Sequence, residues 1–204
     1  LWNTVYLERA VAAIREKGLR YGARMLEIAK LLGAGVALIV PGVVTADGSY
    51  QQAYDRALGA LRELAPVAER TGVAIGVENV WNKFLLSPLE FARFVDEIGS
   101  SAVGVYFDIG NVVNYGWPEQ WIRMLGKRTL TVDVKEYSRK LRDEKGPGAG
   151  FNAERREGDC DWQEVLEAHD ERGNPGRGTA EGRGAGPAAT TDHQKPTAAA
   201  TATP

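Results

Sequence analysis

Three carboxylates occupy matching positions near the ends of three short apolar segments of the chain. Glu78, Asp108 and Asp133 each belong to an alternating run, with branched apolar side chains at every second position and small or polar ones between them. A β-strand has a side-chain period of two, so each carboxylate is expected on the less apolar face, at the strand's carboxyl end. Three buried carboxylates in register repel one another unless protons or a cation neutralise them.

The pattern therefore predicts a divalent metal ion held by Glu78, Asp108 and Asp133. Ligation by oxygen alone favours Mg²⁺ or Mn²⁺ over Zn²⁺ or Co²⁺. The alternative stays open that one or more of the three side chains point into loops and are solvated. A single Glu at a strand exit is explained as well by hydrogen bonds to loop amides.

Other candidates for chemistry lie in the segments that follow these strands. Asn82 and Asn111 could bond substrate hydroxyls, Arg139 could contact a substrate oxygen, and Trp81 could form one wall of a pocket. Turn formation is an equally good account of the asparagines, and packing is an alternative for Trp81. Arg139 could equally be a local ion-pair partner.

Lys135 follows Asp133 on the same predicted strand. Its ammonium could offset negative charge that forms on a substrate. It could equally pair with a neighbouring carboxylate, for example Glu136.

The segments that must position these residues alternate between strand and helix. Helix starts are marked by Ser49 with Gln52, a capping box, and by Ser87 followed by Pro88. Glycines at 18 and 22 weaken the first helix, so a bend or break is expected there. We expect strands at 36–40, 73–78, 103–108 and 129–136, helices at 7–32, 49–72, 87–99, 118–126 and 161–170, and loops at 109–116 and 137–160.

Such alternation predicts an α/β fold with a parallel sheet, which is either doubly wound or a (β/α) barrel. Small residues at Ala74, Gly76 and Gly104 favour the crowded interior of a barrel, and no Gly-rich phosphate fingerprint follows any strand. A complete barrel takes about 250 residues. We therefore expect residues 1–170 to form a partial barrel, with its first strands upstream of Leu1 and its last strands missing.

The carboxyl-terminal segment differs in composition from the rest of the chain. From about Gly173 onward it contains no Val, Ile, Leu, Met or aromatic residue. Such a segment buries too little apolar area to offset its ordering entropy. Residues 171–204 are therefore predicted to be a disordered tail.

Composition limits the possible partners. The 204 residues carry a net charge of −2, which gives no reason to expect nucleic acid or an anionic membrane as a partner. A single cysteine, Cys160, indicates a reducing compartment, which we take as the cytoplasm. No apolar run approaches membrane-spanning length. The open sheet edges of a partial barrel would favour a homo-oligomer.

Three consecutive segments of the chain resemble a known family. They read ENVWNKFLLSPLEF from Glu78, VYFDIGNVVNYGWPEQWI from Val105 and GKRTLTVDVKEY from Gly126. They are similar to sugar phosphate isomerases and epimerases of the xylose isomerase-like TIM-barrel superfamily. Relatives include ketose 3-epimerases, hexulose-6-phosphate isomerases, hydroxypyruvate isomerases and inosose dehydratases.

The resemblance implies a metal held by Glu78, Asp108 and a His from a His-x-Lys-Asp motif, with a last Glu from a late strand. In this chain Asp133 stands at the His position and Lys135-Glu136 at the Lys-Asp pair, and no candidate for the last Glu is evident. Asp can still bind Mg²⁺ or Mn²⁺.

The implied reaction converts a ketose or ketose phosphate through an enediolate, with Glu78 as acid and base and Lys135 offsetting charge. The alternative from another class is a truncated barrel without activity.

Overall fold

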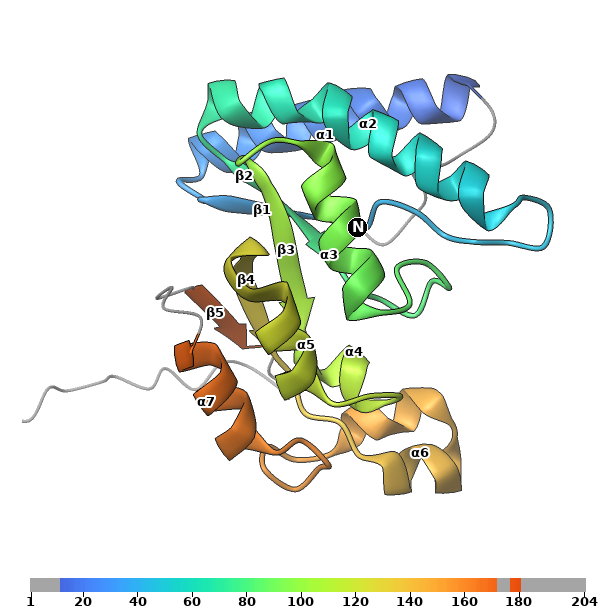
Figure 1. The fold of residues 1–204 in the computed structure, drawn as a ribbon, viewed down its shortest axis with the longest axis vertical. Helices are drawn as coiled ribbons and strands as arrows, with labels where there is room; N and C mark the ends of the chain where they lie inside the picture. Colours follow the sequence, from blue (N-terminus) through green and yellow to red (C-terminus); the bar gives the residue numbers. More distant parts are fainter. Residues whose placement is uncertain (1–11, 172–176, 181–204) are drawn as a thin grey trace, which may run out of the picture.

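The computed structural model of the chain describes residues 12–171 and 177–180, in which helices and strands alternate (Figure 1). The strands are β1 (Val36–Ile39), β2 (Ala74–Glu78), β3 (Val103–Asp108), β4 (Thr129–Val134) and β5 (Arg177–Ala180). The helices are α1 (Ala12–Leu31), α2 (Tyr50–Thr71), α3 (Pro88–Ile98), α4 (Ile109–Val113), α5 (Pro118–Leu125), α6 (Arg139–Lys145) and α7 (Trp162–Glu171), with 3₁₀ turns η1 (Gly126–Arg128) and η2 (Pro147–Asn152).

The order of the strands decides between the two predicted architectures. All five strands are parallel and lie in chain order, from β1 through β5. A doubly wound sheet reverses its strand order at a switch point, and this sheet does not. The long helices also follow one another in space, with α1 on α2, α2 on α3, α3 on α5 and α5 on α7. A sheet with sequential strands and one layer of successive helices is part of a (β/α) barrel.

The two faces of the central strands differ as their alternation predicts. Ile75, Val77, Val105 and Phe107 are fully buried among helical side chains of the core. On the other face Gly76 has no room for a side chain, since a Cβ atom there would lie 2.9 Å from Cβ of Tyr106. The face that carries the small residues is therefore the barrel interior.

Strand β4 departs from simple alternation at its start. The pairing of β3 with β4 shifts between Val105 and Tyr106, which marks a β-bulge. Simple alternation would put Leu130 on the same face as Val132, but it lies over Gly104, where a Cβ atom would be 2.6 Å from Cγ of Leu130. The bulge thus changes the side to which Leu130 points.

The predicted helix caps are confirmed. Ser49 and Gln52 form the capping box of α2, and the Ser87 hydroxyl accepts from the amide of Glu90 at the start of α3. Gly72 and Gly99 end these two helices in the left-handed region, with φ of 72° and 76°. These local signals fix the residues at which α2 and α3 begin and end.

The first helix does not break at its glycines. Helix α1 is continuous from Ala12 to Leu31, and its predicted first residues lie outside the described part of the chain. A Cβ atom at position 22 would lie 2.8 Å from Cδ1 of Leu64, so Gly22 lets α1 approach α2 closely.

Five elements were not predicted, one of them the 3₁₀ turn η1 between α5 and β4. Helix α4 lies in the expected 109–116 loop, and α6 and η2 lie in the expected 137–160 loop. Strand β5 lies within the expected tail and pairs with β4, so the prediction of disorder is wrong at residues 177–180. Strand β4 also ends at Val134, two residues before the predicted end at 136.

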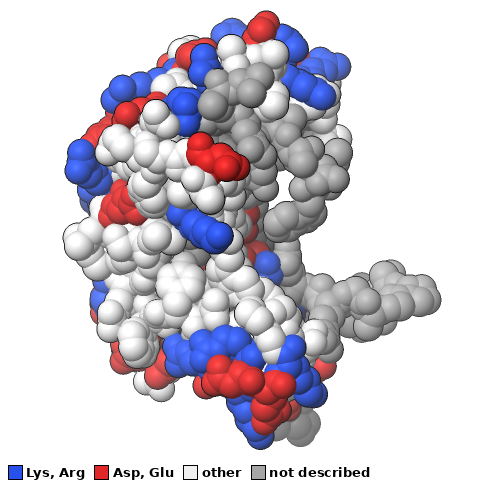
Figure 2. Space-filling model, turned by 90° about the vertical axis from the view of Figure 1, so that its right-hand side faces the viewer, with Lys and Arg blue, Asp and Glu red and all other residues white. Residues whose placement is uncertain are grey.

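The surface carries charges of both signs. On the face in Figure 2 acidic and basic side chains are interspersed among the described residues, without a continuous basic area. Within the described part of the chain, no helix has the length and apolar character needed to cross a membrane.

Candidate active site

Two of the three predicted carboxylates meet at the carboxyl end of the sheet. Asp108 and Asp133 are paired in register on β3 and β4, so their side chains lie next to each other on the interior face. Lys135 lies between them, with its Nζ 3.0 Å from Oδ2 of Asp108 and 3.5 Å from Oδ2 of Asp133. The side chain of Asp108 is fully buried and that of Asp133 nearly so. We call these three residues the ionic cluster.

Two asparagines fix the position of Asp108. The side chain of Asn79, which follows β2, donates to the carbonyl oxygen of Asp108 at 2.9 Å and accepts from its amide at 2.8 Å. The amide of Asn111 donates to Oδ1 of Asp108 at 2.8 Å, which makes Asp108 the N-cap of α4. The Asn111 side chain in turn donates to the carbonyl oxygen of Asn79. Asn79 was not predicted as a site residue, although it lies directly beside Glu78 at a strand end.

Burial changes the acidity of Asp108. Loss of solvent raises the pKa of Asp108 to about 6, and repulsion from Asp133 adds to the rise. The ammonium of Lys135 and the amide of Asn111 oppose the rise because they stabilise the charged carboxylate. Lys135 therefore helps the Asp108 carboxyl group to stay ionised in a buried place that favours its neutral form.

Glu78 lies on the strand beside the ionic cluster. It is buried at the end of β2 and pairs in register with Tyr106, two residues before Asp108. Residues two apart on a strand share a face, so Glu78 points to the same interior side as Asp108. The structure thus places all three predicted carboxylates on one face and joins two of them through Lys135.

The arrangement does not fit a metal centre with three carboxylates. Within the described residues no group of three or more His, Cys, Asp and Glu side chains converges closely enough to hold a metal ion. One oxygen of Asp108 accepts from the amide of Asn111 and the other faces Lys135. The cation between Asp108 and Asp133 is the lysine ammonium, and within the part of the chain that the structure describes no side-chain group supports the predicted site for Mn²⁺ or Mg²⁺.

The predicted partner of Lys135 is wrong. Glu136 does not pair with it but accepts from the indole of Trp162 at 2.7 Å and from the amide of Arg156 at 2.8 Å. Successive side chains point to opposite faces in extended backbone, so Lys135 points toward Asp108 and Asp133, and Glu136 points to the other side.

Two of the predicted substrate-binding residues brace loops. The Asn82 side chain donates to the carbonyl oxygen of Gly42 at 2.5 Å and accepts from the amide of Phe84 at 3.1 Å. Arg139 donates to the carbonyl oxygens of Val113 and Gly116, both at 2.8 Å. Asn111 has the bracing role described above. Substrate contacts by these three residues stay predictions.

An aromatic cluster borders the site. The ring of Trp81 stacks on Phe151 with centroids 5.1 Å apart, and Tyr137 meets both rings edge-on. The Trp81 indole donates to the carbonyl oxygen of Asn111, which ties the cluster to α4. Trp81 is 38% exposed, while Tyr137 is fully buried. Tyr137 and Phe151 were missed because they lie in a Gly-rich stretch that was expected to be a loop.

The resemblance implies a last Glu from a late strand, and the structure has such a strand, β5, after α7. Strand β5 follows α7 and ends at Ala180, and the next residue in the sequence is Glu181. Glu181 lies outside the described residues.

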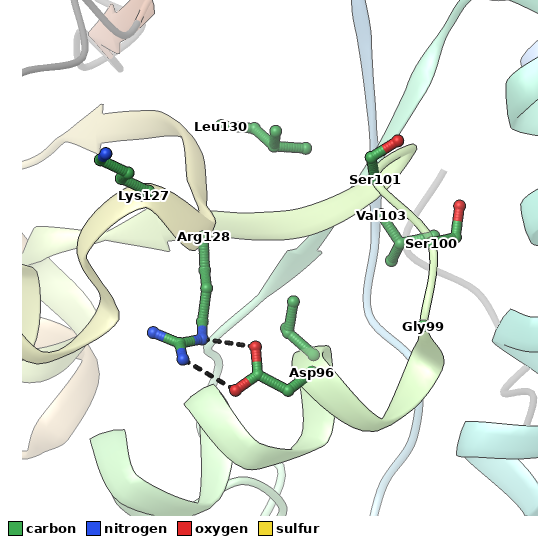
Figure 3. A pocket seen from close by; sticks show the side chains of 9 residues that line it. Asp96, Gly99, Ser100, Ser101, Val103, Lys127, Arg128 and Leu130 are labelled. Carbon is green, nitrogen blue, oxygen red and sulfur yellow. Dashed lines mark hydrogen bonds and ion pairs between the residues drawn. The ribbon is translucent and has the colours of Figure 1, made fainter.

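A separate pocket of about 500 Å³ lies at the opposite end of the sheet (Figure 3). Its lining comes from the end of α3 and from the residues at and just before the starts of β3 and β4, including Ser100, Lys127 and Arg128. Two dashed contacts join Arg128 to Asp96, each of 2.7 Å. Barrel enzymes place their chemistry at the carboxyl ends of the strands, so this pocket is on the side that serves stability.

The chain is similar to solved sugar epimerases in fold. It superposes on a D-tagatose 3-epimerase-like protein with a TM-score of 0.76 and 23% identity, covering 88% of this chain and 67% of that one. With a D-psicose 3-epimerase from Clostridium cellulolyticum H10, solved with D-tagatose, the TM-score is 0.70 and the identity 19%, covering 86% and 59% of the two chains. At these identities the likeness concerns the fold.

A sequence relative and a family match complete the comparison. Over 100 residues the chain is 32% identical to the 2-epi-5-epi-valiolone 7-phosphate 2-epimerase of Actinoplanes sp., which is 49% of this chain and 35% of that protein. The chain thus spans about a third of the length of this curated relative. Residues 7–200 match the family described as xylose isomerase-like TIM barrel. With that match and a sheet of sequential parallel strands, the chain belongs to the xylose isomerase-like TIM-barrel family and forms part of such a barrel.

Proposed function

We propose that this chain carries the site of an isomerase or epimerase of a ketose or ketose phosphate, and that the reaction begins with removal of the proton next to the carbonyl group. The observation that supports the proposal is the ionic cluster at the carboxyl end of the sheet, with Glu78 on the adjacent strand. The active sites of barrel enzymes lie at this end of the sheet, and their catalytic residues come from the ends of several strands.

In the proposed reaction Glu78 acts as the base. Its carboxylate takes the proton from the carbon beside the carbonyl, the C–H electron pair forms a C=C bond, and the carbonyl oxygen becomes an enediolate oxygen. The ammonium of Lys135 supplies positive charge for that oxygen. In a buried site such charge is effective because water does not screen it.

The same intermediate leads to two products. Return of the proton to the neighbouring carbon gives an isomer, and Glu78 can perform this step alone. Return to the original carbon from the opposite face gives an epimer and needs a second proton donor. Product identity therefore reports whether a second donor takes part.

The aromatic cluster suits a sugar. The C–H faces of a sugar ring are apolar, and an exposed indole such as Trp81 offers a flat surface for them. We propose that Trp81, held by Phe151 and Tyr137, forms this wall. The predicted hydrogen bonds from Asn82, Asn111 and Arg139 would require each to give up or share a backbone partner.

The test is conversion of a substrate panel by the full chain. The panel holds ketohexoses, their phosphates and 2-epi-5-epi-valiolone 7-phosphate, the last because of the 32% identity with its epimerase. Products are separated by ion-exchange chromatography. We expect at least one substrate to be converted, with activity lost in Asp108→Asn. The matched control is Asp55→Asn on the exposed side of α2, which is expected to keep activity.

A folded chain that converts no member of the panel contradicts the proposal. It would favour the alternative of a barrel part without activity of its own. Far-ultraviolet circular dichroism of each variant separates loss of activity from loss of fold.

A further inference from the structure

We propose that the ammonium of Lys135 is the resident cation of this site, and that it keeps divalent metal ions from binding between Asp108 and Asp133. The inference uses the same side chains as the proposed function, but it concerns cation binding alone. It is therefore tested without a substrate, and its failure is distinguishable from failure of the catalytic proposal.

The position of the ammonium supports the inference. Its Nζ atom is within 3.5 Å of an oxygen of each Asp, and the two strand positions are direct neighbours. Two carboxylates so close in a buried place need a compensating charge. A divalent ion bound between them would have to displace the ammonium or accept its repulsion at short range.

The surroundings hold the lysine in this place. Gly110 leaves room for its side chain, since a Cβ atom there would lie 3.1 Å from both Cβ and Cγ of Lys135. The Nζ atom lies 5.4 Å from the centre of the Phe151 ring, a distance at which a cation is attracted to the ring face. The Lys135 side chain is only 20% exposed, so little water competes with these contacts.

The number of carboxylate oxygens available to a metal ion also supports the inference. Mg²⁺ and Mn²⁺ require about six oxygen ligands in near-octahedral geometry. Asp108 has one oxygen committed to the amide of Asn111 at 2.8 Å, and its other oxygen bonds to Lys135. The cluster therefore offers few oxygens to a metal while the lysine is in place.

The experiment measures Mn²⁺ binding and thermal unfolding of the full chain and of Lys135→Met. The Met side chain keeps much of the length and removes the charge. We expect wild type to bind no stoichiometric Mn²⁺ in equilibrium dialysis and to show an unchanged unfolding midpoint. We expect Lys135→Met to bind one equivalent, with the midpoint raised by roughly 5–10 °C when Mn²⁺ is present at about 100 times its Kd.

Two further variants complete the design. Lys135→Arg keeps the positive charge and is expected to behave as wild type, and Lys127→Met at the other end of the sheet is the matched control for loss of a lysine. Stoichiometric Mn²⁺ binding by wild type overturns the inference, and this result needs no variant to fold. A folded Lys135→Met that binds no Mn²⁺ overturns it as well.

Discussion

At the scale of single residues, Asn79 shows how the chain holds its buried carboxylate. Both polar ends of its side chain bond the backbone of Asp108, at 2.9 and 2.8 Å, and Asn79 is itself buried. A truncation here leaves buried donor and acceptor groups without their partner, which is more costly than the loss of an exposed hydrogen bond.

We predict that Asn79→Ala lowers the free energy of unfolding by about 2 kcal/mol. Urea unfolding followed by circular dichroism measures the change. Gln163→Ala, which removes an exposed side chain from α7, is the control and should stay within about 0.5 kcal/mol of wild type. Equal effects of the two substitutions would show that Asn79 does not hold the site.

Residue-level prediction from the sequence succeeded for the faces of the three carboxylates and failed for their partners. Period-two alternation correctly placed Glu78, Asp108 and Asp133 on one side of the sheet. The same rule puts Lys135 on the side of Asp133 and Glu136 on the other, but proximity along the chain suggested a pair between Lys135 and Glu136. Asn79 was missed because its role depends on a contact with a residue 29 positions away.

At the scale of elements, glycines in a strand and in a helix should respond oppositely to the same substitution. Gly76 of β2 faces the crowded interior, where a new Cβ atom would be 2.9 Å from Tyr106 and 3.0 Å from Val36. Gly59 lies in α2 and has no atom within 4 Å of such a Cβ.

We predict that Gly76→Ala destabilises the chain by about 1–3 kcal/mol through overpacking. We predict that Gly59→Ala stabilises it by roughly 0.5–1 kcal/mol, because alanine loses less conformational freedom in a helix. Thermal unfolding of both variants gives the comparison. A stabilising Gly76→Ala would mean that the interior face is open rather than closely packed.

Elements with strong local signals were predictable, and those without them were not. The helices that begin at Ser49 and Ser87 carry both a cap and an apolar stripe, and their bounds agree with the structure. Helix α6 has no buried residue, so it shows no apolar period. Helix α4 spans five residues and is capped by Asp108 itself, and β5 owes its place to backbone pairing with β4.

At the scale of the whole molecule, the order of the sheet predicts a gradient of stability. Strand β3 is central and pairs with β2 and β4, while β1 and β5 are the edges of the described sheet. Backbone amides in doubly paired, buried strands open only in the largest unfolding events, whereas edge strands open locally.

We therefore predict that hydrogen exchange measured by mass spectrometry is slowest in peptides that cover Val103–Asp108 and fastest, among the strands, in those that cover Arg177–Ala180. Peptides from α6, which has no buried residue, should also exchange early. Equal protection of β5 and β3 would contradict an open edge at β5.

The proposed function depends on removal of a proton from a sugar by Glu78, beside the ionic cluster. Incubation of the full chain with the substrate panel in D₂O, followed by proton NMR, measures this step directly, because deuterium enters the substrate whether or not a product is released. We predict deuterium at the carbon next to the carbonyl, with the rate at least ~100-fold lower in Glu78→Gln. The rate should be unchanged in Glu63→Gln, on the exposed side of α2. Exchange that is absent from every substrate, or equally fast in Glu78→Gln, would contradict the claim.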